Sequence, residues 1–180
     1  MLLPPALGAL GALVALVLSA LIASGAQARN SQPTATMQPP TFKPALGWWI
    51  LSTGPTDDRQ FTPETWAASD PGGVQPDAFD LFKGLRKLTR QGILIWASNS
   101  GRGSPTRVFT PAHWPLQLST FRVDRGWEGQ PAANVQQRLR WASVDGWHLD
   151  IRVYFGTQHP SAALRAKAQA ELNRLQLPRR

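Results

Sequence analysis

The stretch that decides the fold runs from residue 135 to residue 155 and reads VQQRLRWASVDGWHLDIRVYF. Its second half alternates strictly between apolar and polar side chains. The apolar members are Trp147, Leu149, Ile151, Val153 and Phe155. A period of two predicts a half-buried antiparallel strand. The first half alternates as well, and Asp145-Gly146 between the halves is a hairpin signal. We therefore expect a β-hairpin.

The register of this hairpin follows from which side chains must share a face. A two-residue turn would place Arg138 and Arg140 on the apolar face and bury two guanidinium groups there. A three-residue loop over residues 144–146 places Leu139 on that face instead. Because a slip of one residue moves every side chain to the other face, the second register is strongly favoured. We expect a type I turn with a G1 bulge and Gly146 in the left-handed conformation.

In this register the polar face of the hairpin carries the candidate binding residues. Arg138 lies opposite Arg152, and like charges that face each other directly are mildly destabilising. Such a pair flanked by Tyr154 is a place where an anion can bind, and Arg140 lies opposite Asp150 beside it. The alternative is a solvated or partner-covered face, because most exposed charge pairs contribute little free energy. The candidate ligand-binding residues are Arg138, Arg152, Tyr154 and Arg140.

Other segments complete a small domain. Further strands are expected at residues 47–52, 93–97 and 116–123, and loops at 53–76 (with a short turn at 63–66), 98–104 and 124–134. Helices are expected over residues 77–91 and from Pro160 to Pro178, because apolar residues recur there at helical spacing. The fold class is α+β: a small antiparallel sheet of about four or five strands packed by two helices, with a C-terminal β-hairpin followed by a terminal α-helix.

The N-terminal segment predicts export. Residues 6–23 are apolar or small and uncharged, and the small-x-small triplet Ala26-Gln27-Ala28 follows. This order is typical of a secretory signal peptide cleaved after Ala28. No Lys or Arg precedes the run, and its 18 residues are barely enough to cross a bilayer. An uncleaved membrane anchor and a buried core helix are the alternatives, although basic residues after the segment disfavour an anchor with the domain outside.

These patterns divide the sequence into three regions. Residues 1–28 are expected to be a signal peptide or N-terminal membrane anchor, residues 29–45 a Pro-rich linker, and residues 46–178 a single α+β domain. The chain has 180 residues and a formal charge of +8, but residues 29–80 carry −3 and residues 81–180 carry +11. This uneven charge excludes an acidic disordered protein. The absence of cysteine excludes a disulfide scaffold and a thiol nucleophile.

The sequence contains no motif that carries a chemical reaction. Its three histidines are scattered, and no catalytic residue, metal ligand set or cofactor motif can be named. Eight tryptophans are present, some in expected loops near arginines, where they can stack on a ligand or form cation–π pairs. More often such residues close a small core.

The expected function is therefore a non-catalytic extracytoplasmic protein of the cell envelope or the secreted fraction, with a structural, accessory or binding role. The alternative is a module that binds an acidic ligand through the arginine-rich hairpin face: an anionic glycan, a lipid headgroup or a small anion. A hydrolase without a recognisable motif is third. The expected partner is an anionic envelope component or a protein, and nucleic acid is not expected. The membrane is contacted through residues 6–23 if they are not cleaved.

Overall fold

The structure, a computed structural model, describes residues 38–43, 45–52, 63–69, 85–100, 107–124 and 134–177, and these belong to one compact unit. The strands are β1 (Thr41–Phe42), β2 (Trp49–Ser52), β3 (Glu64–Ala68), β4 (Ile93–Asn99), β5 (Thr110–Pro111), β6 (Arg122–Asp124), β7 (Gln136–Val144), β8 (Trp147–Phe155) and β9 (Leu175–Gln176). The helices are the 3-10 helix η1 (Leu118–Thr120) and α3 (Ala162–Leu172). Residues 85–87 add one short helical turn.

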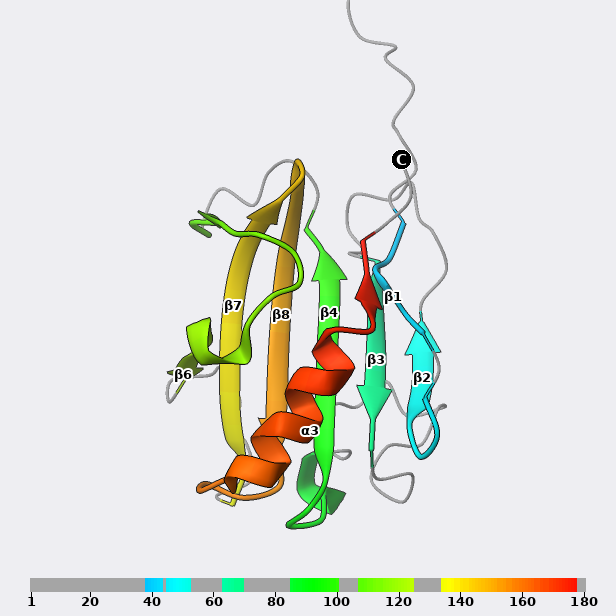
Figure 1. Cartoon of the computed structure of the whole chain (residues 1–180), viewed down its shortest axis with the longest axis vertical. Helices are drawn as coiled ribbons and strands as arrows, with labels where there is room; N and C mark the ends of the chain where they lie inside the picture. The colour runs from blue at the N-terminus through cyan, green and yellow to red at the C-terminus, as the bar shows by residue number, and fades with distance from the viewer. Residues whose placement is uncertain are drawn as a thin grey trace, which may run out of the picture. The chain divides into compact units, whose positions relative to one another are not determined.

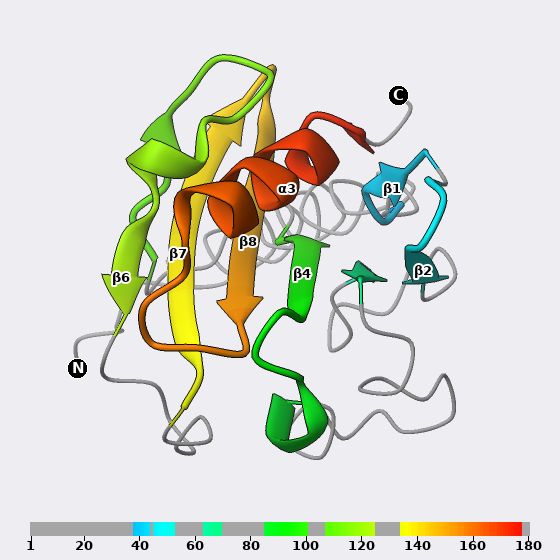
Figure 2. The ribbon, with the colours of Figure 1, turned by 60° about the horizontal axis from the view of Figure 1, so that its bottom comes forward.

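Seven of these strands form one mixed sheet. Its order is β2-β3-β4-β8-β7-β5, and β6 also pairs with β7, beside which it lies in Figure 2. Only β5 runs parallel to its neighbour, and β1 pairs with β9 in a second, two-stranded sheet. The described residues are therefore mostly β, with nine strands in two sheets. The expected α+β fold, with four or five antiparallel strands packed by two helices, is wrong.

The strands that sequence patterns missed are short or lie in segments rich in turn residues. Strands β1, β5, β6 and β9 have two or three residues each, which is too few to show a period of two. The segment expected as a strand at 116–123 is η1 followed by β6, and the expected turn at 63–66 opens β3. The strand expected at 93–97 is confirmed as β4, which lies in the interior of the sheet between β3 and β8.

The hairpin of β7 and β8 is confirmed, but its register is the other one. Arg138 pairs with Val153 rather than with Arg152, and the turn has two residues. Both have positive φ, 48° at Asp145 and 81° at Gly146, as in a type I′ turn. The left-handed conformation expected for Gly146 is confirmed. The three-residue loop with its bulge is wrong.

The physical reason is that both faces of β7 are partly covered. Leu139 lies on the face opposite α3 and is nevertheless 3% exposed. Arg138 and Arg140 lie on the α3 side but stay only half-buried near the sheet edge. Nε of Arg138 donates to Gln136 Oε1 at 3.0 Å, and Nη1 of Arg140 donates to the Thr120 carbonyl at 3.3 Å. The alternation of polar and apolar residues along β7 therefore does not determine which register forms.

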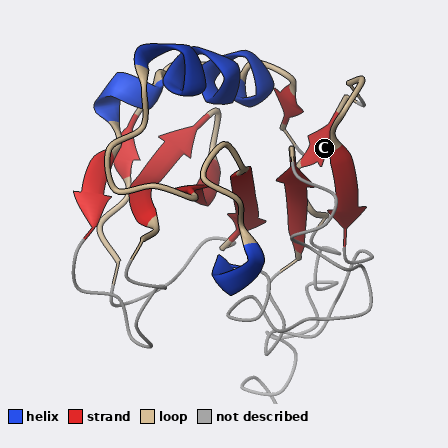
Figure 3. Cartoon of the chain, turned by 90° about the horizontal axis from the view of Figure 1, so that it is seen from below, coloured by secondary structure: helices blue, strands red, loops and turns tan. Residues whose placement is uncertain are grey.

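Two layers of unequal size pack against the sheet. Helix α3 crosses one face diagonally, and η1 lies on the same side (Figures 1 and 3). The main hydrophobic core fills this interface and includes Ile95, Ile151, Phe155, Leu164 and Leu172. A smaller cluster covers part of the opposite face, where the helical turn at 85–87 lies. The largest buried surfaces are thus on the α3 side, and the other face carries more polar groups.

The helices and the chain ends differ from expectation in detail. Helix α3 begins after Ser161, whose Oγ accepts a hydrogen bond from the Leu164 N–H at 3.1 Å, rather than at Pro160. Of the helix expected over 77–91, residues 77–84 lie outside the described residues, and only 85–87 are helical beyond them. The expected signal or anchor at 1–28 also lies outside them. No helix within the described ranges is long and apolar enough to cross a membrane.

Part of the expected linker takes part in the fold. Phe42 in β1 is 6% exposed and belongs to the main core, and β1 pairs with β9 next to the end of α3. The folded unit thus includes residues that precede the expected boundary at residue 46.

Candidate functional site

The four residues that the sequence nominated are divided between the two faces of the sheet. Arg138 and Arg140 lie on the α3 side of β7, whereas Arg152 and Tyr154 lie on the opposite side of β8. The predicted pairing of Arg138 with Arg152, and of Arg140 with Asp150, therefore does not form. It fails for the same reason as the register: the Asp-Gly turn has two residues and not three.

The opposite face collects a different set of side chains, which we call the arginine–tryptophan face. Its members are Trp66, Trp96, Trp141, Arg107, Arg122 and Arg152. They come from five strands and from the segment before β5. The three indoles are half-buried, so each has one part in the protein and one part at the surface. The face therefore combines the apolar surface of the indoles with cationic guanidinium groups on one side of the sheet.

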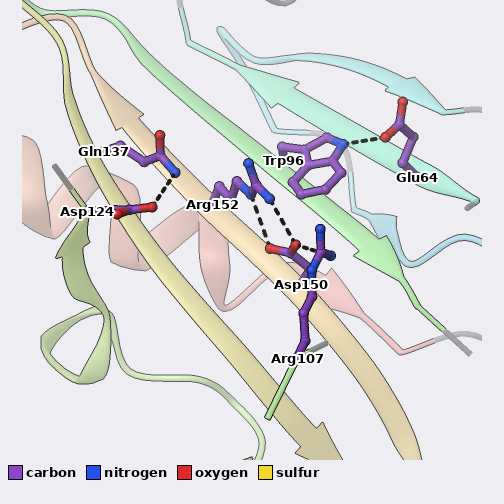
Figure 4. A network of polar contacts seen from close by, with 7 residues as sticks. All are labelled: Glu64, Trp96, Arg107, Asp124, Gln137, Asp150 and Arg152. Carbon is purple, nitrogen blue, oxygen red and sulfur yellow. Dashed lines mark hydrogen bonds and ion pairs between the residues drawn. The ribbon is translucent and has the colours of Figure 1, made fainter. Parts of the chain in front are cut away.

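A buried carboxylate lies at the centre of this face. Asp150 on β8 has no exposed side-chain surface, and its Oδ2 lies 2.7 Å from Nη1 of Arg107 and 3.1 Å from Nη2 of Arg152. Nε of Arg152 donates to the other carboxylate oxygen at 3.2 Å, so the contact is bidentate (Figure 4). A buried charge is tolerated when it is paired and hydrogen-bonded in this way. Asp150 fixes both guanidinium groups.

Burial shapes the protonation of the neighbouring groups. Burial tends to lower the pKa of Arg152, but its hydrogen bonds to Asp150 and the attraction between them outweigh burial and leave the pKa raised. Burial raises the pKa of the Tyr154 phenol far above its usual value, although Arg152 opposes this. Tyr154 therefore remains a neutral phenol next to a permanently charged guanidinium.

A second carboxylate holds the indoles of β3 and β4 in place. Nε1 of Trp96 donates to Oε2 of Glu64 at 2.6 Å (Figure 4). Burial raises the pKa of Glu64, while hydrogen bonds from Trp96 and Trp66 and the charge of Arg152 act in the other direction. The rings of Trp66 and Trp96 lie 5.9 Å apart, tilted by 47°. The hydrogen bond turns the polar edge of Trp96 toward Glu64.

Three cation–π contacts connect the arginines to the indoles. The guanidinium carbon of Arg152 lies 4.8 Å from the ring centroid of Trp96. Those of Arg122 and Arg107 lie 4.9 and 5.7 Å from the ring centroid of Trp141. Contacts of this kind orient a guanidinium group while its N–H edges stay free to donate.

These arginines differ in how much donor capacity they retain. Arg152 is mostly buried, and two of its donors contact Asp150. The Arg107 side chain keeps 33% of its surface exposed. Arg122 is exposed, and no described acidic side chain forms an ion pair with it. Asp124 lies on the same face of β6 as Arg122, and its Oδ2 accepts a hydrogen bond from Gln137 Nε2 at 3.3 Å. The three arginines therefore face two acids, Asp150 and Asp124, which leaves this part of the face with one excess positive charge.

The arrangement is suited to binding a negatively charged group. Guanidinium forks match the geometry of carboxylate, sulfate and phosphate oxygens. Within the described residues, no three His, Asp or Glu side chains are grouped so that they could hold a metal ion. His148 stacks on Phe109 at 4.7 Å between ring centroids, with an interplanar angle of 11°. Its side chain is thus engaged in packing.

A cavity lies at the C-terminal end of α3. This cavity of about 310 Å³ is lined by Lys43, Trp114, Asn173, Arg174, Leu175, Gln176 and Leu177. Its two cations lie where the carbonyl end of the helix concentrates partial negative charge. That electrostatic role accounts for them without a ligand, so the arginine–tryptophan face is the stronger candidate.

Sequence reasoning missed most of this site. The predicted register places Trp141 on the apolar side of the hairpin, and the sequence indicates no role for Arg107 or Arg122. The sequence predicts cation–π pairs for tryptophans in loops, whereas the pairs with arginine form at Trp96 and Trp141, which lie on strands. Which partners meet could not be found, because they are 19 to 56 positions apart in the chain and come together only through the strand order.

Compared with models of protein families, with curated proteins and with solved structures, the chain matches none of them. The candidate site therefore rests on the geometry of the described residues.

Proposed function

We propose that the protein is a non-catalytic extracytoplasmic binding protein, and that an acidic ligand binds to the arginine–tryptophan face. The ligand chemistry that fits is a carboxylate, sulfate or phosphate group, which could belong to an anionic glycan, a lipid headgroup or a small anion. This ligand class is the one expected from the sequence, but its binding site lies on the side of the sheet that carries Arg122 and not on the side that carries Arg138.

The observation that carries this proposal is the pair of arginines on one indole. Arg107 and Arg122 both place their guanidinium carbons within 6 Å of the Trp141 centroid. The two guanidinium carbons are therefore no more than about 11 Å apart, and like charges within this distance repel each other unless a counter-charge lies nearby. Asp150 supplies that charge to Arg107 but is shared with Arg152. An anion bound at Arg122 would relieve the remaining excess.

The extracytoplasmic location is supported by the sequence alone. The uncharged run at residues 6–23 and the triplet Ala26-Gln27-Ala28 have the order of a signal peptide. Mass spectrometry of the protein expressed with its whole chain should find an N-terminus at Arg29 in the exported fraction. An intact Met1 in the membrane fraction would instead establish the uncleaved anchor.

The binding test compares two arginines on opposite faces of the sheet. Inorganic phosphate, a sulfated dextran, neutral dextran and vesicles containing phosphatidylglycerol are titrated against the wild type, Arg122→Ala and Arg138→Ala. Loss of one charge-assisted contact costs about 1.5–3 kcal/mol when desolvated. Because Arg122 is exposed, we expect the low end, about a tenfold loss of affinity for the charged probes, smaller at high salt.

Arg138→Ala is the matched control, since it removes an arginine from the same sheet on the α3 side. Its affinity for the charged probes should stay within twofold of the wild type. Equal losses in both variants would indicate nonspecific attraction by the basic domain and refute the site. Binding of neutral dextran as tight as that of sulfated dextran would refute the acidic ligand. The vesicle and phosphate arms distinguish a headgroup from a free anion.

A further inference from the structure

A continuous row of side chains crosses the arginine–tryptophan face at right angles to the strands. The register places directly opposite neighbours in the order Leu51, Trp66, Trp96, Arg152, Leu139 and Arg122. The row passes through β2, β3, β4, β8, β7 and β6. With strands about 4.8 Å apart, six strands span about 24 Å. The row is therefore much longer than a single anionic group needs.

Polarity is segregated along this row. Its β2–β4 end consists of Leu51, Trp66 and Trp96, and Trp49 on the same face of β2 is 52% exposed. All its charged groups lie at the β8–β6 end. The boundary between the two ends is the stack of Arg152 on Trp96, with 4.8 Å between guanidinium carbon and ring centroid (Figure 4). The surface is thus apolar at one end and cationic at the other.

Glu64 adds a carboxylate near the apolar end of the row. It lies one row away from Trp96 on the apolar side and is held there by the Trp96 N–H at 2.6 Å. A polyanion repeats its charge along its whole length, so its far end would lie over Leu51, Trp66 and Trp96, none of which is a cation, and would be repelled by an ionised Glu64. A ligand with a single acidic group avoids both costs.

From this polarity we infer that the ligand is an anionic amphiphile: an elongated apolar body that lies over Trp66 and Trp96, and one acidic head at Arg107 and Arg122. The inference rests on the proposed function, because it takes the acidic head from that site. To the proposed function it adds that the ligand has an apolar body and that this body lies across the strands. It also explains why an acidic polysaccharide fits less well.

The test measures how affinity depends on the length of the body. Ethyl, butyl, hexyl and octyl phosphate are titrated as monomers by calorimetry against the whole chain. A fully buried methylene contributes about 0.8 kcal/mol, and a one-sided surface covers about half of it. Two added methylenes should therefore raise the affinity about fourfold.

Two variants separate the ends of the row. Trp66→Ala should reduce the gain for each added pair of methylenes to less than twofold. Arg122→Ala should lower the affinity for every member of the series by the same factor and keep the fourfold gain. The control Trp48→Ala removes a half-buried indole that packs on the main core and stacks with Lys167 at 5.8 Å. It should leave both the affinities and the gain unchanged.

Several results would overturn the inference. These are a series with no dependence on length, the same gain in Trp66→Ala as in the wild type, octyl glucoside bound as tightly as octyl phosphate, and a sulfated dextran bound more tightly than octyl phosphate. If one of them is found while ethyl phosphate still depends on Arg122, the amphiphile is refuted and the proposed function stands. If ethyl phosphate does not depend on Arg122, the proposed function fails as well.

Discussion

Removing the charge of Asp150 tests whether the centre of the arginine–tryptophan face is built as described. Asp150→Asn keeps the size of the side chain but abolishes its negative charge. Arg152, with only 12% of its side chain exposed, would then be a buried cation without its carboxylate partner. Arg107 is 33% exposed and can turn toward water. The cost should therefore arise mainly at Arg152.

The magnitude follows from this difference in exposure. Breaking a buried ion pair by removing one partner costs about 3–5 kcal/mol. Arg152 keeps its stack on Trp96 and some access to water, so we expect the lower end, about 3 kcal/mol of unfolding free energy. With a urea slope of about 2 kcal/mol per M, the midpoint of unfolding should fall by about 1.5 M.

The assay is urea unfolding followed by circular dichroism at neutral pH, and the chain offers a matched control. Asp145→Asn is the same chemical change at an exposed residue of the same hairpin, and Asn tolerates the positive φ of 48° found there. Its unfolding free energy should change by no more than about 0.5 kcal/mol. A second variant, Asp150→Asn with Arg152→Leu, removes the unpaired charge and should recover about half of the loss.

Two results would refute the reasoning. If Asp150→Asn and Asp145→Asn shift the midpoint equally, Asp150 does not hold buried charge. If the double variant is less stable than Asp150→Asn alone, the cost does not come from an unpaired Arg152. In that case the network stabilises the fold by packing, and its arginines would not need Asp150 in order to stay in place.

Two further predictions concern stability. Burial raises the pKa of Glu171, with Arg174 acting against this, so the folded protein holds that proton more tightly than the unfolded chain does. The resulting stability is fully present below the usual pKa of a glutamate and is lost as the pH rises through the raised value. Glu171→Gln should therefore become more stable relative to the wild type as the pH rises from 4 to 8, and thermal melts across this range should show it; equal shifts at all pH values would contradict it. Gly156→Ala places a Cβ 1.8 Å from the Thr89 carbonyl oxygen and should cost about 3 kcal/mol or more in urea unfolding, whereas Gly47→Ala, with φ of 76° and no atom within 4 Å, should cost about 1 kcal/mol.

The elements that the sequence predicted correctly are those with long, regular patterns. The alternation from Trp147 to Phe155 is β8, the apolar run from Ile93 is β4, and the spacing of Leu164, Ala168 and Leu172 is the buried stripe of α3. The missed elements have no such pattern. A two-residue strand such as β1 or β5 is defined by the neighbour it pairs with, and that neighbour is distant in the sequence.

The prediction of the candidate site was wrong at one step. It assumed that only one face of the hairpin is buried. A two-residue turn places two arginines on the apolar face, and because a slip of one residue exchanges the faces, the sequence favours the three-residue loop. In this protein the face opposite α3 also buries residues, among them Leu139 and Val135, while the α3 side near η1 leaves room for Arg138 and Arg140. With both faces partly covered, alternation no longer discriminates, and the type I′ geometry of Asp145-Gly146 decides the register.

The same one-residue difference determines which side chains can form a site. In the observed register Trp141 is opposite Asp150 and Leu139 is opposite Arg152, so the indole shares a face with the acid and the arginine that surround it. Arg122, paired with Leu139, is thereby brought to the same face and reaches the Trp141 ring. In the predicted register Trp141 would lie under α3, and Arg138 would take its place beside Arg152. A hairpin turn of two residues instead of three thus exchanges an arginine pair for an arginine–tryptophan face, and this exchange is why Arg122 and not Arg138 is the residue to mutate first.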